Sequence, residues 1–195
     1  MRLHLPVALR WGDLDAFNHV NNVSLLKILE EARVRALWSP TTAGEDAPST
    51  AVIGAGTSGD DRGGATLTLI ARQEIEYLAP IEYRRAPLDI QLWFGALGGA
   101  SFDLCYDVVD GPGTIEGAES AGHTDADVNR RVPDGPNGAI GRQAGAVAAE
   151  PRSYARAMAT VVLVDSLTMR PRRIDARERA AWEPYLGEPI TFRRR

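Results

Sequence analysis

The chain has 195 residues, of which 44% are hydrophobic and 25% are charged, and its formal net charge is −4. This length suits one domain with a substantial core, and the negative charge argues against nucleic acid as the main partner. The sequence has no secretory signal pattern, no apolar run near the roughly 20 residues that cross a bilayer, and only one cysteine, Cys105. We therefore expect a cytoplasmic protein without a membrane segment or an intramolecular disulfide.

The first two predicted elements are a strand and a long helix. Between residues 3 and 11 every second side chain is apolar, which predicts a half-buried strand whose buried face ends at Trp11. From Asn22 to Trp38 the apolar side chains recur at helical spacing, which predicts a helix with one buried face. Either Asn21 or Asn22 is expected to cap this helix, because a short amide side chain accepts from the N–H groups of the first turn.

Four more strands and a short helix are predicted after a loop. Residues 40–64 are rich in Gly, Ala, Thr, Ser and Asp, which indicates a loop with one short strand near 51–53. Alternating apolar residues then predict an antiparallel meander, with a tight turn at Gly98-Gly99. Its strands are expected at 67–78, 88–97, 101–109 and 154–165. A short helix over 175–185, with Asp175 as its N-cap, follows.

Residues 111–153 do not continue this pattern. They are dominated by Gly, Ala, Asp, Arg and Pro, and their few large apolar residues show no period. Such a segment buries too little surface to offset the entropy lost on ordering. We therefore predict a flexible insertion before the last strand, within a single domain over 1–195. The remaining elements, one amphipathic helix and one antiparallel sheet, predict a two-layer α+β fold.

The polar junction between the first strand and the helix is the most informative segment. Residues 10–23 read Arg-Trp-Gly-Asp-Leu-Asp-Ala-Phe-Asn-His-Val-Asn-Asn-Val. Asp15 is a candidate base or nucleophile, and the first turn of a helix offers N–H groups that stabilise a developing oxyanion. The candidate oxyanion donors are the main-chain amides of Val20, Asn21, Asn22 and Val23. Together these groups supply what hydrolysis of an activated acyl group requires.

Each polar residue of the junction also has a structural interpretation. Asp13 is expected to cap the turn, and Asp15 has the same alternative, because Asp side chains often accept N–H bonds in turns. His19 is either a site residue or a satisfied polar side chain. Asn21 and Asn22 are favoured as helix caps over catalysts. We find no metal-ligand spacing and no nucleotide-binding motif, so neither a metal nor a cofactor is expected.

This segment resembles the Asp-x-Asp-x-x-x-His-Val-Asn-Asn signature of the hotdog-fold acyl-CoA thioesterases, the 4-hydroxybenzoyl-CoA thioesterase-like family. The resemblance implies an antiparallel sheet wrapped around a long central helix, and subunits paired edge to edge as a homodimer or a dimer of dimers. It implies that Asp15, the second aspartate, is the catalytic carboxylate and that His19 orients it or acts as an auxiliary base. Plant acyl-carrier-protein thioesterases have a similar run with an Asn at the position that Phe17 occupies here.

The activity implied by the resemblance is hydrolysis of an acyl-CoA to a free acid, with coenzyme A as part of the substrate. Three alternatives stay open: an acyl-carrier-protein thioesterase, a hydratase on the same fold, and a non-catalytic module that binds acyl-CoA. Arg84 and Arg85 are candidate partners for the phosphates of coenzyme A. A solvated charge cluster is the favoured alternative for both.

Overall fold

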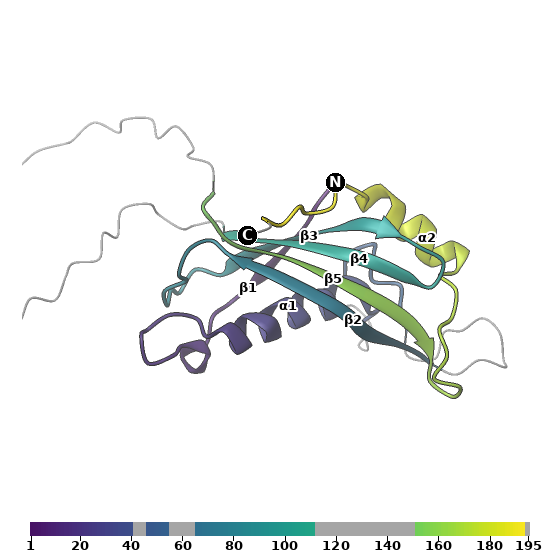
Figure 1. The fold of residues 1–195 in the computed structure, drawn as a ribbon, viewed down its shortest axis with the longest axis horizontal. Helices are drawn as coiled ribbons and strands as arrows, with labels where there is room; N and C mark the ends of the chain where they lie inside the picture. Colours follow the sequence, from purple (N-terminus) through teal and green to yellow (C-terminus); the bar gives the residue numbers. More distant parts are fainter. Residues whose placement is uncertain (41–45, 55–64, 112–150, 194–195) are drawn as a thin grey trace, which may run out of the picture.

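The structure, a computed structural model, describes residues 1–40, 46–54, 65–111 and 151–193 (Figure 1). Its elements are β1 (Leu3–Val7), the 3-10 helix η1 (Trp11–Asp13), α1 (Asn22–Leu37), β2 (Thr66–Tyr77), β3 (Leu88–Leu97), β4 (Ser101–Asp110), β5 (Ser153–Asp165), α2 (Ala176–Trp182) and the 3-10 helix η2 (Glu183–Tyr185). Residues 112–150, most of the predicted insertion, lie outside the described residues.

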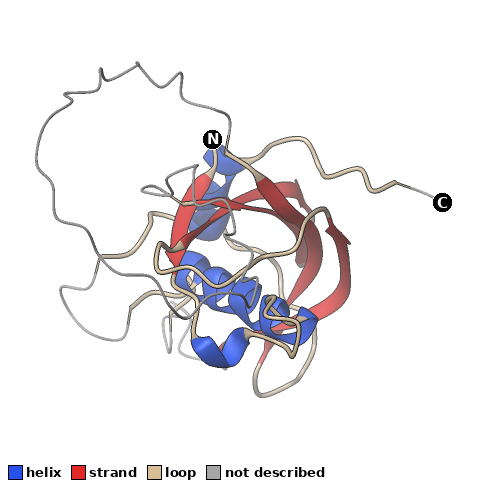
Figure 2. Ribbon diagram, turned by 90° about the vertical axis from the view of Figure 1, so that its left-hand side faces the viewer, coloured by secondary structure: helices blue, strands red, loops and turns tan. Residues whose placement is uncertain are grey.

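The five strands form one antiparallel sheet in the order β1-β3-β4-β5-β2. The sheet curves, and α1 lies against its concave side (Figures 1 and 2). The predicted α+β fold, with a sheet wrapped around a long central helix, is confirmed.

The predicted order of the strands is wrong at one position. β2 does not pair with β3, the next strand in the sequence, but with β5 at the edge of the sheet opposite β1. Tyr77 at the end of β2 therefore lies opposite Ala155 near the start of β5. Just beyond it, the N–H of Leu78 donates to the carbonyl of Tyr154 at 2.8 Å. Alternating apolar residues indicate which face a strand buries, but they do not identify its neighbour.

The central helix begins and ends close to the predicted positions. Asn21 is its N-cap, because its side-chain oxygen accepts from the N–H of Val23 at 2.8 Å. Leu29, Ala32 and Ala36 have no exposed surface where the helix meets the sheet. Both the predicted helix and the predicted cap are confirmed. In the part of the chain that the structure describes, no helix is long and apolar enough to cross a membrane.

α2 closes one end of the core. The Trp182 side chain has no exposed surface, and its ring centroid lies 5.3 Å from that of Phe94 and 4.9 Å from that of Phe102. Asp175 accepts from the N–H of Glu178 at 2.8 Å, and the Glu178 carboxylate accepts from the N–H of Asp175 at 2.9 Å. The predicted N-cap is confirmed. The predicted helix over 175–185 consists of α2, which ends at Trp182, and the 3-10 helix η2, which follows it to Tyr185.

Two predicted strands differ from the structure. β1 ends at Val7 rather than near Trp11, whose side chain is 73% exposed. After Val7 the chain leaves its partner β3, and Asp13 then fixes a turn by accepting from the N–H of Arg10 at 2.7 Å. Residues 51–53 contribute only an isolated bridge rather than a strand. The placement of Trp11 on the buried face of a strand was therefore wrong.

Candidate active site

The segment between β1 and α1 is a closed loop that holds its polar side chains in place. The N–H of Asp15 donates to the carbonyl of His19 at 2.8 Å, and the N–H of Asn18 donates to the carbonyl of Asp15 at 3.1 Å. Asn18 has a φ of 61°, a left-handed conformation that Asn adopts more readily than most residues. The N–H of Val20 donates to the carbonyl of Ile81 at 2.8 Å, which ties the loop to the segment after β2.

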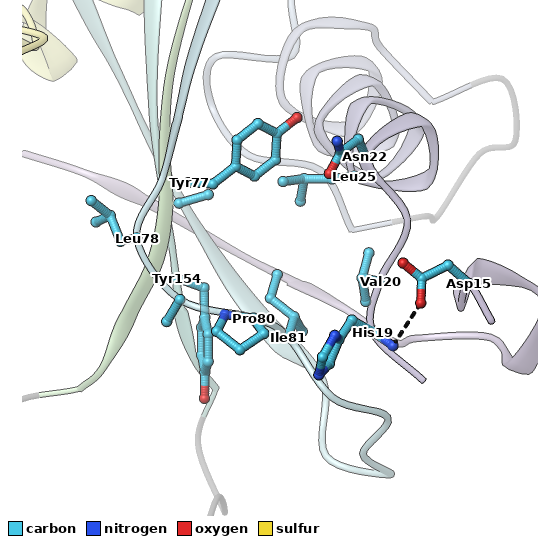
Figure 3. Close-up of a pocket in the computed structure, with 12 residues that line it drawn as sticks. Asp15, His19, Val20, Asn22, Leu25, Tyr77, Leu78, Pro80, Ile81 and Tyr154 are labelled. Atoms are coloured by element: carbon cyan, nitrogen blue, oxygen red, sulfur yellow. Dashed lines mark hydrogen bonds between the residues drawn. The ribbon is translucent and has the colours of Figure 1, made fainter. Parts of the chain in front are cut away.

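A pocket of about 380 Å³ opens beside this loop (Figure 3). One wall comes from the loop and the start of α1: Asp15, His19, Val20, Asn22 and Leu25. The opposite wall comes from residues 77–81 together with Tyr154 and Ala155. The pocket thus brings together four of the predicted site residues, and it leaves out Asn21 and Val23.

Asp15 combines the two interpretations that the sequence left open. Its Oδ1 accepts from the N–H of Phe17 at 2.8 Å and from the N–H of His19 at 3.2 Å, which is a turn-stabilising arrangement. Its Oδ2 has no hydrogen-bond partner among the described residues. Figure 3 shows one oxygen directed to the main chain of His19 and the other turned away from that bond. The main chain therefore fixes the carboxylate and leaves one oxygen for a ligand or a water molecule.

His19 lines the same pocket, but its ring is not the group that contacts Asp15. The contact is made by its main-chain N–H. Within the described part of the chain, the imidazole has no hydrogen-bond partner. Its role as an auxiliary base or as an orienting group stays a prediction.

Only one of the four predicted oxyanion donors has a main-chain N–H with no acceptor among the described residues. The other three donate to protein acceptors: Val20 to Ile81 O at 2.8 Å, Asn21 to Asp13 O at 2.9 Å, and Val23 to Asn21 Oδ1 at 2.8 Å. The remaining donor is Asn22, which is the first residue of α1 and lines the pocket. The set of candidate donors therefore narrows to the Asn22 N–H.

Asn21 lies outside the pocket, and its capping bond predicts the effect of replacing it. Asn21→Ala is expected to lower the free energy of unfolding by about 1 kcal/mol, because the N–H of Val23 loses its acceptor. Asn21→Ser is expected to keep most of the stability, since a serine hydroxyl also caps helices. Denaturant unfolding followed by circular dichroism measures both, and identical midpoints for wild type and Asn21→Ala would contradict the capping role.

The wall of the pocket opposite the loop is held by a polar cluster. The Tyr154 hydroxyl donates to Asp110 Oδ1 at 2.7 Å and accepts from Arg84 Nη2 at 2.6 Å, and Arg84 also pairs with Asp110. Burial, and then the hydrogen bond to Asp110, raises the pKa of Tyr154. Burial alone would lower the pKa of Arg84, but its bonds to Tyr154 and Asp110 raise it overall. Both groups therefore keep their protons at neutral pH, and the wall is fixed by charge-assisted bonds.

Sequence reasoning did not find this second wall, because its parts meet only through the pairing of β2 with β5. The only sequence signal was the Arg84-Arg85 pair, which was considered as a phosphate clamp. Arg84 instead pairs with Asp110 inside the protein.

Asp13 has the capping role that the sequence predicted. It accepts from the N–H of Arg10, and together with residues of α1 it lines a separate cavity of about 340 Å³. In the described ranges, no group of three or more His, Cys, Asp or Glu side chains is arranged to hold a metal ion.

Comparison with solved structures shows the same fold in thioesterases and related proteins. The PA5185 protein of Pseudomonas aeruginosa is 18% identical with a TM-score of 0.57, covering 94% of this chain and 91% of that one. A thioesterase superfamily protein of Jannaschia sp. CCS1 is 16% identical with a TM-score of 0.57, covering 96% and 93%. The dynemicin thioesterase is 12% identical with a TM-score of 0.59, covering 97% and 100%. At these identities the likeness shows the fold alone.

No curated protein sequence is significantly similar to the chain. Residues 9–184 do match the thioesterase-like superfamily, and this range contains the loop, the start of α1 and both walls of the pocket. Because the match spans most of the sequence and agrees with the fold, the chain belongs to the thioesterase-like superfamily.

Proposed function

We propose that the protein hydrolyses acyl-CoA thioesters to a free carboxylic acid and coenzyme A, with Asp15 as the base or the nucleophile. The observation that carries the proposal is the state of the Asp15 carboxylate. It lines a pocket at the start of the central helix, two main-chain N–H groups hold one of its oxygens, and the other oxygen has no partner among the described residues. Membership of the thioesterase-like superfamily supplies the reaction class.

The proposed reaction proceeds by one of two routes. As a base, Asp15 takes a proton from a water molecule whose oxygen attacks the thioester carbon. The tetrahedral intermediate then collapses, the carbon–sulfur bond breaks, and the thiolate of coenzyme A leaves with that proton. As a nucleophile, the carboxylate attacks the carbon itself and expels the thiolate, and water then hydrolyses the resulting anhydride to regenerate Asp15.

Both routes place negative charge on the carbonyl oxygen, and Asn22 is the proposed donor to it. Its N–H is at the first position of α1, where the partial positive charge of the helix adds to the hydrogen bond. The N–H groups on either side of it already have protein acceptors. Because Asn22 and Asp15 line the same pocket, one main-chain donor and one free carboxylate oxygen are available there for this chemistry.

The remaining lining suits an acyl group. Leu25, Leu78, Ile81 and Ala155 supply apolar surface. The volume of about 380 Å³ lies within the range of pockets that enclose small ligands. We propose that the acyl chain occupies this apolar part and that the thioester lies at the polar end near Asp15.

We also propose that the protein is a homodimer paired through β2. This strand forms an edge of the described sheet and exposes apolar side chains, which is unusual for an unprotected edge. They are Leu67, Leu69, Ile70 and Tyr77, each at least 40% exposed. Pairing through this edge would give a closed two-fold assembly. It would also place the partner beside the pocket, since Tyr77 lines it.

The experiment that tests the function is thiol release from a series of acyl-CoAs of increasing chain length, including an aromatic one. The proposal predicts turnover that depends on the acyl group. If the protein binds acyl-CoA tightly and releases no thiol at any chain length, the non-catalytic interpretation replaces it. If only thioesters on acyl-carrier protein react, the carrier assignment is wrong and the hydrolase assignment stands.

A further inference from the structure

Two exposed aromatic side chains lie against each other near the pocket. Trp11 is 73% exposed and Tyr83 is 40% exposed, with their ring centroids 5.4 Å apart and their planes at 72°. The contact leaves most of the indole surface open to solvent. Large rings of this kind are normally buried, so an exposed pair in contact points to a ligand.

Trp11 belongs to the loop that carries the catalytic candidate. It lies four residues before Asp15, and an extended chain of that length spans at most about 14 Å. The real separation is smaller, because residues 11–13 form a 3-10 turn. The pantetheine arm of coenzyme A is long and flexible enough to join a thioester at Asp15 to a group at Trp11.

Tyr83 lies in the segment after β2, which contacts both the loop and the opposite wall of the pocket. The residue before it, Glu82, forms a backbone bridge with His19. The residue after it, Arg84, donates to Tyr154 in the opposite wall. Both aromatic residues therefore lie on segments that are fastened to the rim of the pocket.

A positive charge lies close to the aromatic pair. Arg85 is two residues after Tyr83, and its side chain is exposed and not ion-paired within the described ranges. Arg10, which precedes Trp11, lines the separate cavity with Asp13 instead. A guanidinium presents a planar fork that suits phosphate. Acidic residues outnumber basic ones in this chain, whose net charge is −4, and an arginine that none of the described ones pairs with is available to bind a phosphate.

We propose that Trp11 and Tyr83 form a platform on which the adenine of coenzyme A stacks, with Arg85 beside its phosphates. The inference rests on the proposed function and adds where the nucleotide of coenzyme A binds; the arm of acyl-carrier protein carries no adenine. Stacking of a base on an aromatic side chain strengthens binding by about tenfold or more. The platform therefore raises kcat/KM for acyl-CoA without taking part in the chemistry.

The test compares one acyl group on two carriers, coenzyme A and pantetheine, which lacks the nucleotide. Trp11→Ala is expected to lower kcat/KM for acyl-CoA by about tenfold or more and to leave kcat/KM for acyl-pantetheine within about twofold. Trp11→Phe keeps a ring and is expected to recover most of the loss. Leu167→Ala, a variant at another exposed apolar side chain that lies in the turn after β5, is the control. It is expected to match wild type on both substrates.

An equal loss on both carriers would overturn the platform, because it would mean that Trp11 only supports the loop. No loss on acyl-CoA would overturn it as well. Binding of free coenzyme A and of pantetheine, measured by calorimetry, separates this inference from the proposed function. Even if no thioester is hydrolysed, the platform predicts that wild type binds coenzyme A about tenfold or more tightly than pantetheine and that Trp11→Ala loses this preference. Equal affinities in wild type would exclude it.

Discussion

Asp15→Asn is expected to lower kcat by about a hundredfold or more, the scale usual for removing a catalytic acid–base group. The substitution is nearly isosteric, and the amide oxygen of asparagine can still accept from the N–H groups of Phe17 and His19. The loop is therefore expected to keep its conformation. What is lost is an oxygen able to take a proton from water or to attack the thioester carbon.

The matched control for this variant is Asp13→Asn. Asp13 lies on the same loop and loses the same charge, but it caps the turn and lines the separate cavity. Its kcat is expected to stay within about threefold of wild type, because the charge it carries lies outside the reaction site. Steady-state thiol release together with a thermal unfolding curve for each protein gives the comparison. An equally large loss of kcat in both variants would show that the rate depends on the total charge of the loop and not on Asp15 as a catalytic group.

The local features of the loop and the helices were predictable from the sequence. The Asn21 cap, the Asp175 cap and the Asp13 turn each depend on a side chain that bonds to main chain within three residues. Such bonds follow from residue type and spacing alone. The same holds for the position of Asp15 at the entrance to α1.

The other half of the pocket was not predictable in this way. Tyr77 and Tyr154 are far apart in the sequence and come together only because β2 pairs with β5. A hydrophobic pattern carries no information on that choice, so a meander in sequence order was an equally good solution. The exposure of Trp11 was missed for a related reason, since the strand pattern continues past the point where β1 loses its partner.

The oxyanion donor needed the structure as well. Helix geometry predicts several free N–H groups in a first turn, and the sequence offered four candidates. The bonds of Val20, Asn21 and Val23 to other groups leave Asn22 as the candidate without a protein acceptor in the described part of the chain. Because only one candidate is left, its N–H can be tested by replacing Asn22 with proline, which has no N–H.

Asn22→Pro is expected to lower kcat by about 10²- to 10³-fold, because proline has no N–H to donate to the oxyanion. Asn22 is the first residue of α1, a position that favours proline. The residue before it, Asn21, has φ −63° and ψ 144°, and this extended conformation is the one that a following proline requires. The free energy of unfolding is therefore expected to change by less than about 0.5 kcal/mol, as for substitutions that break no native contact.

Asn22→Ala separates the main-chain donor from the side chain. It removes the amide that lines the pocket and keeps the N–H, so its kcat is expected to stay within about fivefold of wild type. Thiol release measured at saturating acyl-CoA compares the two variants, and circular dichroism verifies that both retain the helix. If proline and alanine reduce kcat to the same extent, the side chain is responsible, and the oxyanion must be stabilised by another group. If proline alone reduces it and the helix is retained, the loss is assigned to the N–H at the start of α1, because proline lacks this donor and alanine keeps it.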